Sequence, residues 1–514
     1  MFSRDVCDVI FRCSILFIVK KVIVIGSGFA GLSAACCLAK EGFQVTILEK
    51  NDGLGGRART FSTEGFVFDM GPSWYWMPDV FEDFFALFGK KVSDYYELVR
   101  LDPSYQVFFG PNDQEDVPAQ MTDLEAFFER IEPGSTPNLR KFLAEAEYKY
   151  RVGMGEFVHK PSHSLWEFAD ARVLSSLVKL QMFTPISKHV RKLFKHEKLI
   201  QLLEFPVLFL GATPQNTPAL YSLMNYADMA LGTWYPMGGM FKIVEGMATL
   251  ARELGVEIRP SHEVMHIETH NGKALAAITT DGKRHEADAF VGSADYHHIE
   301  TKLLDSADRN YRESYWKSRV MAPSSLLWYV GVNTRLSGLK HHNLFFDEDF
   351  GVHSEEIYTN PQWPSKPLFY ASVPSVTDPN VAPEGCENLF LLIPVAPGLE
   401  DTPEIRAHYF DVVLGRLERH TGQNIRQHIV YQRSFAHTDF VEDYHAFRGN
   451  AYGLANTLLQ TAFLKPKMKN RQLSNLWYTG QLTVPGPGVP PSLISGQVVA
   501  GEVKKWSESG DVRK

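Results

Sequence analysis

Three glycines near the start of the chain have the spacing of a phosphate-binding turn. Gly26, Gly28 and Gly31 form a G-x-G-x-x-G pattern that follows an apolar run at residues 22–25. In such a turn the first glycine permits a tight bend, the second lets the backbone approach a pyrophosphate, and the third lets helix and strand pack closely. The N-terminus of the following helix would stabilise the negative charge of the phosphates. The pattern therefore predicts a dinucleotide-binding site.

A carboxylate follows at the place where a ribose would lie. Glu49 closes a second apolar strand, which is predicted at residues 45–48. An acidic residue at the end of this strand accepts hydrogen bonds from the adenosine ribose. The same carboxylate repels a 2′-phosphate, which argues against NADP. Because the glycines stand in a strand–turn–helix–strand context, the signal is much stronger than the glycine pattern alone.

A second glycine-rich loop comes directly after that strand. Residues 50–60 read KNDGLGGRART and contain Gly55, Gly56 and Arg57. A nicotinamide dinucleotide does not require such a loop, whereas FAD has more surface to cover on its phosphate side. Backbone N–H groups at the two glycines could approach the cofactor, and Arg57 could pair with phosphate charge. The loop favours FAD over NAD; the alternative is a surface loop with solvent-facing arginines.

These motifs resemble those of the flavoprotein amine oxidase superfamily, and two further motifs are more specific. The superfamily likeness lies in GSGFAGLSA at residues 26–34, EKNDGLGGRA at 49–58 and FDMGPS at 68–73. YPMGGM at residues 235–240 and the segment 475–501 resemble the bacterial-type phytoene desaturases, which are carotenoid desaturases. The resemblance runs from about residue 20 to about residue 505. Pro491 departs from the pattern, because a small or apolar residue is expected there.

The resemblance extends the set of predicted cofactor-binding residues beyond the two glycine-rich loops. It adds positions in the FDMGPS element, in the middle of the chain and in the C-terminal segment. The complete set is Gly26, Gly28, Gly31, Glu49, Lys50, Gly55, Gly56, Arg57, Gly71, Pro72, Ser73, Val264, Asp295, Gly480, Gly488, Val489 and Pro490. A helix predicted to begin at Ser492 and to run to Val499, with its N-terminus aimed at the flavin, would stabilise negative charge on the reduced flavin.

The fold class that follows is α/β, with a discontinuous Rossmann-like FAD-binding domain and an α+β substrate domain. The FAD-binding domain is predicted to combine residues 20–100, 241–300 and 471–508. Residues 101–240 and 301–470 are expected to form the substrate-binding region, including helices that face a membrane. Residues 1–19 are predicted to be an N-terminal extension outside the fold, and the alternatives are a short surface anchor or a signal peptide.

The family implies an FAD-dependent oxidoreductase acting on CH–CH bonds. The leading hypothesis is a phytoene desaturase that introduces double bonds toward neurosporene or lycopene, with oxygen or a quinone as electron acceptor. The alternatives are a sibling carotenoid enzyme (a hydroxycarotenoid 3,4-desaturase, an isomerase or a ketolase), a flavin amine oxidase, or a carotenoid-binding protein without activity. The catalytic residues stay unknown, because the acids in family-like segments are equally suited to structural roles. These acids are Asp69, Asp378, Asp439 and Glu442.

Histidines at every fourth position raise the question of a metal site. His262, His266 and His270 would share one face of a helix, but their segment has the pattern of a strand. On a strand, successive members would lie about 13 Å apart, which one metal ion cannot bridge. We therefore predict no metal site.

Composition excludes several classes of protein. The chain has 514 residues, 44% of them hydrophobic, and a net charge of −8. This balance does not suit a disordered chain, and a nucleic-acid partner is not expected because the net charge is negative. Five cysteines in this length do not form a disulfide framework, so a reducing, cytoplasmic location is expected.

Two segments bear on membranes. Residues 9–19 are apolar but interrupted by Arg12, too short for a spanning helix. Residues 186–198, ISKHVRKLFKHEK, combine an apolar face with basic side chains. Such a helix can lie in the headgroup plane of an anionic membrane, and the alternative is a surface helix packed on its own domain. Because phytoene is insoluble in water, we expect a cytoplasmic protein associated peripherally with a membrane.

Overall fold

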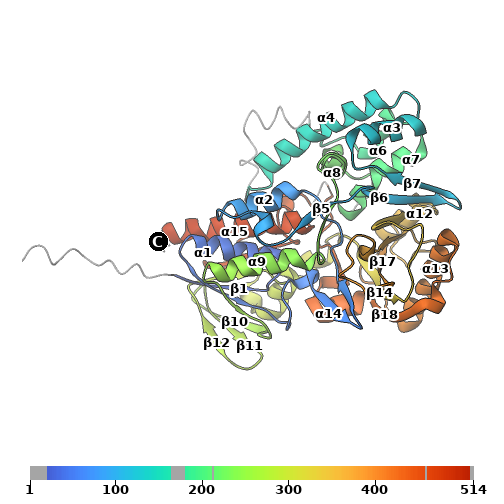
Figure 1. The fold of residues 1–514 in the computed structure, drawn as a ribbon. Coiled ribbons are helices and arrows are strands. Elements are labelled where there is room, and N and C mark those ends of the chain that lie inside the picture. Colours follow the sequence, from blue (N-terminus) through green and yellow to red (C-terminus); the bar gives the residue numbers. More distant parts are fainter. Residues whose placement is uncertain (1–19, 164–179, 211–212, 458–459, 510–514) are drawn as a thin grey trace, which may run out of the picture.

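One half of the molecule is built on a five-stranded parallel sheet (Figure 1). The structure, a computed structural model, describes residues 20–163, 180–210, 213–457 and 460–509; residues 1–19 lie outside these ranges. The strand order is β19-β13-β1-β2-β9, and all neighbours are parallel. The strands are β1 (Lys21–Ile25), β2 (Gln44–Leu48), β9 (Glu257–Arg259), β13 (Ala289–Gly292) and β19 (Leu476–Tyr478). Three distant parts of the chain therefore build one sheet.

Both faces of this sheet are buried, which explains why β1 is apolar throughout. Val22 and Val24 belong to the core on the helical side, whereas Ile23 and Ile25 belong to the core on the opposite side. The helices on the first side are α1 (Phe29–Lys40), α9 (Phe241–Glu253) and α15 (Val489–Glu508). The opposite side carries an antiparallel sheet of β10 (Val264–His270), β11 (Lys273–Thr279) and β12 (Arg284–Glu286).

Helices α1 and α15 are in direct backbone contact. A Cβ atom at Gly496 would overlap the carbonyl oxygen of Ala30 and would lie 2.7 Å from the Cβ of Ser33. The hydroxyl of Ser33 donates a hydrogen bond to the carbonyl oxygen of Leu493 at 2.7 Å. Only a glycine at position 496 permits this approach, which places the start of α1 against the second turn of α15.

The other half contains a seven-stranded mixed sheet whose two faces have different partners. Its order is β18-β14-β17-β16-β15-β6-β7. Trp328 and Val330 pack with Val413 of α13 on one face, whereas Leu327 and Phe390 point to the interior between the two halves. The elements are β6 (Tyr105–Gly110), β7 (Asp113–Val117), β14 (Ser324–Val332), β15 (His342–Phe345), β16 (Phe369–Ser372), β17 (Glu387–Val395), β18 (Ile429–Phe435) and α13 (Pro403–Thr421).

A layer of helices lies beyond β6 and β7, at the top of Figure 1. It comprises α3 (Met121–Ile131), α4 (Thr136–Val152), α6 (Ile186–Leu193), α7 (Glu197–Glu204) and α8 (Leu223–Met229). Shorter elements complete the fold: β3 (Thr60–Thr63) with β4 (Phe66–Asp69), β5 (Leu98–Arg100) with β8 (Trp234–Pro236), α2 (Pro78–Ala86), α10 (Tyr296–His298), α11 (Glu313–Lys317), α12 (Phe350–Tyr358) and α14 (His437–Tyr444).

The structure corrects the interpretation of residues 186–198 as one membrane-docking helix. Helix α6 ends at Leu193, and Phe194 adopts an extended conformation before α7 begins. Ile186, Val190 and Phe194 are fully buried within the helical layer. The apolar face is therefore used inside the protein, and only the basic side faces solvent. No helix within the described ranges has the length and apolarity needed to span a membrane.

Two glycines of α15 offer a matched test of the contact between α1 and α15. Gly496→Ala should lower the free energy of unfolding by about 2 kcal/mol, because the new methyl group overlaps the backbone of α1. Gly501→Ala, where a Cβ meets no atom within 4 Å, should leave stability unchanged or raise it by up to about 1 kcal/mol. Denaturant unfolding followed by tryptophan fluorescence measures both. Equal midpoints for the two variants would contradict the close packing.

Candidate functional site

The loop between β1 and α1 forms one wall of a large cavity. Gly26 has a φ of +101°, a conformation that favours glycine. A Cβ at Gly31 would overlap the carbonyl oxygen of Gly26, so the glycine lets α1 pack closely on this turn. Gly28 is the N-cap of α1 and lines the cavity, and a Cβ there would meet no atom within 4 Å. Backbone N–H groups at the start of α1 are therefore accessible from the cavity.

Glu49 fixes the conformation of the same loop. Its Oε2 accepts hydrogen bonds from the backbone N–H of Ser27 at 2.8 Å and from the Ser27 hydroxyl at 2.6 Å. Its Oε1 accepts from the N–H of Asn51 at 2.9 Å. Since a carboxylate oxygen has more than one acceptor position, these bonds leave room for a ribose hydroxyl. Lys50, the next residue, also lines the cavity. Its Nζ donates a hydrogen bond to the carbonyl oxygen of Glu442.

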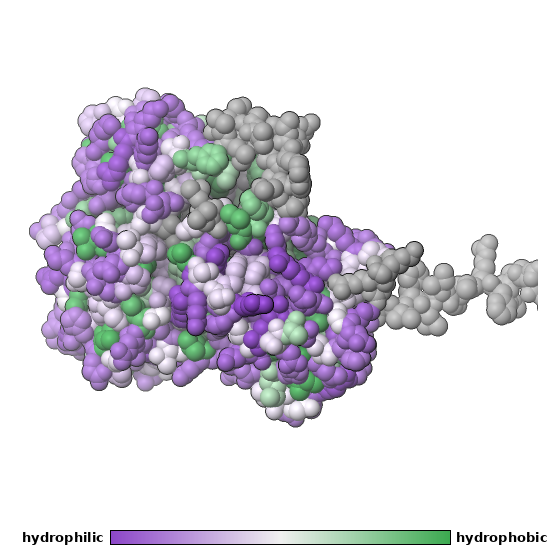
Figure 2. Space-filling model, turned by 180° about the vertical axis from the view of Figure 1, so that it is seen from behind, coloured by the Kyte–Doolittle hydropathy of each residue, from purple (hydrophilic) through white to green (hydrophobic). Residues whose placement is uncertain are grey.

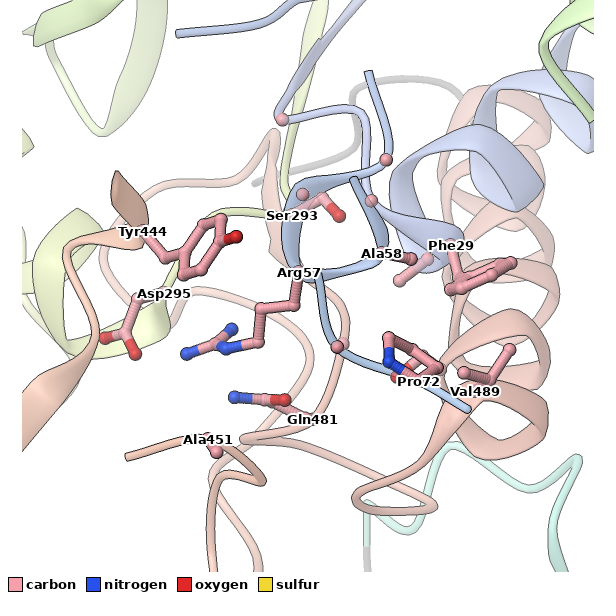
Figure 3. Close-up of a pocket in the computed structure, with 18 of the residues that line it drawn as sticks. Phe29, Arg57, Ala58, Pro72, Ser293, Asp295, Tyr444, Ala451, Gln481 and Val489 are labelled. Atoms are coloured by element: carbon pink, nitrogen blue, oxygen red, sulfur yellow. The ribbon is translucent and has the colours of Figure 1, made fainter. Parts of the chain in front are cut away.

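The second glycine-rich loop places a buried arginine in the cavity. In Figure 3 the side chain of Arg57 extends between Tyr444, Asp295 and Gln481. Its Nη2 donates to the carbonyl oxygen of Asn450 at 3.3 Å, while its Nε has no hydrogen-bond partner. Burial lowers the pKa of Arg57, and the negative charge of Asp295 opposes this shift. The guanidinium therefore offers unused donors inside the cavity.

The segment after β4 lies against this loop. A Cβ at Gly71 would overlap the carbonyl oxygen of Arg57, so the two segments touch through their backbones. Asp69 accepts hydrogen bonds from the N–H groups of Met240 at 2.7 Å and Phe241 at 3.0 Å, at the start of α9. Burial raises the pKa of Asp69 to about 6. Asp69 thus holds α9 against the strand and positions the FDMGPS element beside Arg57.

The C-terminal segment brings a second helix N-terminus to the cavity. Gly488, with a φ of +109°, is the N-cap of α15, and Val489 begins the helix. The N–H of Gly480 donates to the hydroxyl of Ser495 at 3.0 Å, which ties the end of β19 to α15. In Figure 3 Val489 lies near Phe29 of α1 and Pro72. Two helix N-termini therefore open onto the same space, which suits negatively charged groups.

The structure brings nearly all the predicted residues together around one cavity of about 400 Å³. Gly31 is the exception, because it packs α1 on β1 instead. The predicted residues that line the cavity are Gly26, Gly28, Glu49, Lys50, Gly55, Gly56, Arg57, Gly71, Pro72, Ser73, Val264, Asp295, Gly480, Gly488, Val489 and Pro490. Val264 comes from β10 and Asp295 from the loop after β13, where it accepts hydrogen bonds from His298 and Phe447.

The apolar wall of the cavity carries no motif in the sequence. Trp74, Leu327, Tyr370, Phe390 and Leu392 line the cavity beyond the glycine-rich loops. Most of these residues belong to the seven-stranded sheet, whose strands are buried on both faces and show no alternation in sequence. Tyr444 and Gln481, which flank Arg57, also carried no signal. Only the folded sheet distinguishes the residues that face the cavity.

Three of the four acids considered as catalytic candidates, Asp69, Asp378 and Asp439, have structural partners. Asp378 accepts from the N–H of Gly238 at 2.6 Å. Asp439 pairs with Arg406 at 2.7 Å, and Glu442 is exposed. His266 and His270 lie in β10, and the described residues contain no group of three or more His, Cys, Asp or Glu side chains that could hold a metal ion.

The residues around the cavity fit FAD. Two helix N-termini and the two Gly-rich loops suit a pyrophosphate, and Arg57 Nε and Ser293 Oγ are buried polar atoms without partners at the cavity wall. Glu49 is placed for the ribose. The apolar wall beyond Ser73 suits the isoalloxazine ring and a substrate.

Gly28 permits a substitution that changes the cavity without disturbing the protein. Gly28→Ala adds a methyl group where no protein atom lies within 4 Å and where φ, at −66°, suits alanine. We expect a stable protein whose affinity for FAD falls at least about tenfold, because the methyl group blocks the approach of the pyrophosphate. Flavin absorbance relative to protein absorbance measures the bound cofactor, with Gly501→Ala as control. Full occupancy in Gly28→Ala would mean that the phosphates do not lie over this turn.

Comparison with known proteins places the chain in a family. The model for flavin containing amine oxidoreductases matches residues 29–504. A carotenoid 3,4-desaturase from Haloarcula japonica is 44% identical, covering 94% of this chain and 97% of the relative. A zeta-carotene-forming phytoene desaturase from Myxococcus xanthus is 31% identical over 96% of this chain and 95% of the relative. A 4,4′-diapophytoene desaturase from Staphylococcus aureus is 32% identical over 95% of this chain and all of the relative.

Solved structures share the fold at low sequence identity. An oxidoreductase from Methanosarcina mazei matches with a TM-score of 0.61 and 17% identity, over 94% of this chain and 100% of that one. Putrescine oxidase matches with a TM-score of 0.61 and 13% identity, over 95% and 99% of the chains. The glycine-rich loops and the cavity that they line agree with the family match and with the named relatives. The chain therefore belongs to the carotenoid desaturases of the flavin-containing amine oxidoreductase family, as an FAD-dependent oxidoreductase.

Proposed function

We propose that this carotenoid desaturase introduces a double bond at the 3,4 position of an acyclic carotenoid. The observation that supports this choice is the 44% identity to the carotenoid 3,4-desaturase of Haloarcula japonica, over nearly the whole length of both chains. The relatives named as phytoene-type desaturases are 31–32% identical over similar lengths. Phytoene, the leading substrate in the sequence analysis, is the second candidate because of these relatives.

The cavity has the chemistry that a polyene requires. Beyond the FAD-binding residues its wall is formed mostly by aromatic and aliphatic side chains from Trp74 and the seven-stranded sheet. A hydrocarbon chain has no group to hydrogen-bond, so its binding energy comes from the apolar area that it buries. A small soluble amine would gain little from such a wall, which makes the amine oxidase alternative less favourable.

The residues of the chain position the substrate and exclude water. FAD, when bound, accepts the two electrons and the hydrogen that leave the carbon chain. The N-terminus of α15, which begins at Val489, would stabilise negative charge that develops beside it. Trp74, Leu327 and Phe390 exclude water from the bond being oxidised. Oxygen or a quinone would then take the electrons from the reduced flavin.

We further propose that the enzyme takes its substrate from a membrane surface. Carotenoids partition into bilayers, so an enzyme that acts on them must reach the lipid phase. Phe183 is 81% exposed and Leu464 is 40% exposed, which leaves large apolar side chains available for contact with lipid. Figure 2 shows hydrophobic residues gathered beside the helical layer on the face seen from behind. Peripheral association through exposed apolar side chains replaces the docking helix that the sequence predicted.

The activity is tested with two substrates in liposomes. FAD-reconstituted protein should add one double bond at each reacting end of an acyclic carotenoid such as lycopene. The new bond joins the isolated C1=C2 double bond to the conjugated chain, which is seen as a stepwise red shift of the structured absorption bands. Phytoene should give no structured bands in the visible range. Growth of such bands from phytoene would support the second candidate instead, and no reaction with either substrate, under both oxygen and quinone, would contradict both.

Membrane binding is tested by cosedimentation with liposomes. The double variant Phe183→Ser and Leu464→Ser should lower the bound fraction, corresponding to a roughly tenfold or greater loss of affinity, because two apolar side chains are removed. Val430→Ser, at a position 45% exposed on β18, is the matched control and should bind like the native protein. Replacing Lys188, Arg191, Lys192 and Lys195 with Gln should leave binding unchanged even to liposomes that contain anionic lipid, to which a docking basic helix would bind. Weaker binding of the Gln-substituted variant, with unchanged binding of the double variant at Phe183 and Leu464, would instead identify the basic helix as the membrane contact.

A further inference from the structure

A buried lysine lies behind the loop that leads into α15. Lys465 is only 2% exposed, and its Nζ has no hydrogen-bond partner within the described residues. Lysines are almost never fully buried unless they are paired, because an isolated ammonium group in the protein interior is costly. An unpaired lysine at this depth therefore indicates a function rather than a contribution to stability.

The end of the Lys465 side chain lies against Gly486. A Cβ atom at Gly486 would lie 3.4 Å from Lys465 Nζ and 3.2 Å from Oδ1 of Asn456. The glycine, with a φ of +142°, thus leaves room for the Nζ beside the backbone of the loop. Oδ1 of Asn456 is also buried without a partner. Because the amide of Asn456 is neutral, it does not cancel a charge on Lys465.

The loop at residues 484–488 connects this lysine with the large cavity. Pro487 and Gly488 line the cavity, whereas Lys465 and Gly486 do not. Two residues of chain span at most about 7 Å, so Lys465 Nζ lies within roughly 12 Å of Gly488, the N-cap of α15. A charge on this Nζ therefore adds to the partial positive charge of the α15 N-terminus.

The surroundings leave a charge on Lys465 free to act on the cavity. Burial lowers the pKa of Lys465 to about 7, and no charged side chain among the described residues contributes to this shift. The nearby Lys467 is engaged elsewhere, because its Nζ donates to the carbonyl oxygens of Ser162 and His163 at 3.1 Å. A buried charge acts over a longer distance than an exposed one, since the effective dielectric constant is lower and salt screens it less.

We propose that Lys465 stabilises the negative charge of the reduced flavin, together with the N-terminus of α15. A flavin that accepts two electrons and one proton from a substrate gains one negative charge. A protonated Lys465 lowers the free energy of this reduced state relative to the oxidised state, without contact with the substrate. The role is the same for either candidate carotenoid, because it concerns the cofactor alone.

The test measures the reduction potential of bound FAD in the absence of substrate. Lys465→Met removes the charge and keeps an unbranched side chain, and the variant should fold because no partner loses a hydrogen bond. At pH 6, where Lys465 is protonated, the reduced flavin should be stabilised about tenfold less in the variant, which corresponds to a potential lower by about 30 mV. Equilibration with redox dyes of known potential measures this difference.

The difference between the native protein and Lys465→Met should depend on pH. Native Lys465 loses its proton as the pH rises through its pKa of about 7, or through a higher value when the flavin is reduced. The two potentials should therefore converge by pH 9. Lys465→Arg stays charged at every pH, so at pH 9 its potential should exceed the native value by about 30 mV. A purely structural role of Lys465 would produce no such dependence.

Lys505→Met is the matched control. Lys505 is an exposed lysine in the last turn of α15, so its replacement should leave the potential at the native value at both pH values. Equal potentials of the native protein and Lys465→Met at pH 6, or a difference of the same size at pH 6 and pH 9, would overturn the inference. If Lys465→Met does not retain FAD, Lys465→Arg decides, since a native potential of this variant at pH 9 would also overturn it. Because no carotenoid is present, the result does not depend on the proposed function.

Discussion

The site depends on the direct contact between α1 and α15. Gly31 lets α1 lie on the turn that follows β1, and Gly496 lets α15 touch the backbone of α1. Because the helices touch at these glycines, their two N-termini open onto the same cavity, although Gly28 and Gly488 are far apart in the sequence. Both ends carry unpaired backbone N–H groups and partial positive charge. A larger residue at either packing position would move one helix away and divide the cofactor site.

The cavity changes character along its length because different elements form its two ends. Around the glycine-rich loops the wall carries Arg57, Glu49 and Asp295 with the helix N-termini, so charge and hydrogen bonds dominate. Beyond Ser73 the wall comes from the seven-stranded sheet and is mostly apolar. One end therefore suits a charged dinucleotide, and the other suits a lipophilic chain. Where the charged end of the cavity joins the apolar end, a substrate carbon would lie close enough to the flavin to pass electrons to it.

The same sheet also explains where the sequence was misleading. Strands β14 and β17 are apolar on both faces, since one face packs on α13 and the other lines the cavity. An alternation of apolar and polar residues cannot distinguish the core face of a strand from the cavity face when both faces require apolar side chains. The amphipathic pattern of residues 186–198 was misleading because one pattern of residues suits two different environments. An apolar face with basic flanks is compatible with a membrane or with the protein's own helical layer, and burial of Ile186, Val190 and Phe194 decides for the latter.

The sequence by itself determined the dinucleotide half of the site. Gly26, Gly28, Glu49 and Arg57 act through backbone geometry and local spacing, so neighbouring residues suffice to identify them. The tertiary structure decided which distant segments share one cavity and which face of the seven-stranded sheet lines it. These features depend on strand order and helix packing between residues far apart in the chain, and no local pattern of residue types encodes them.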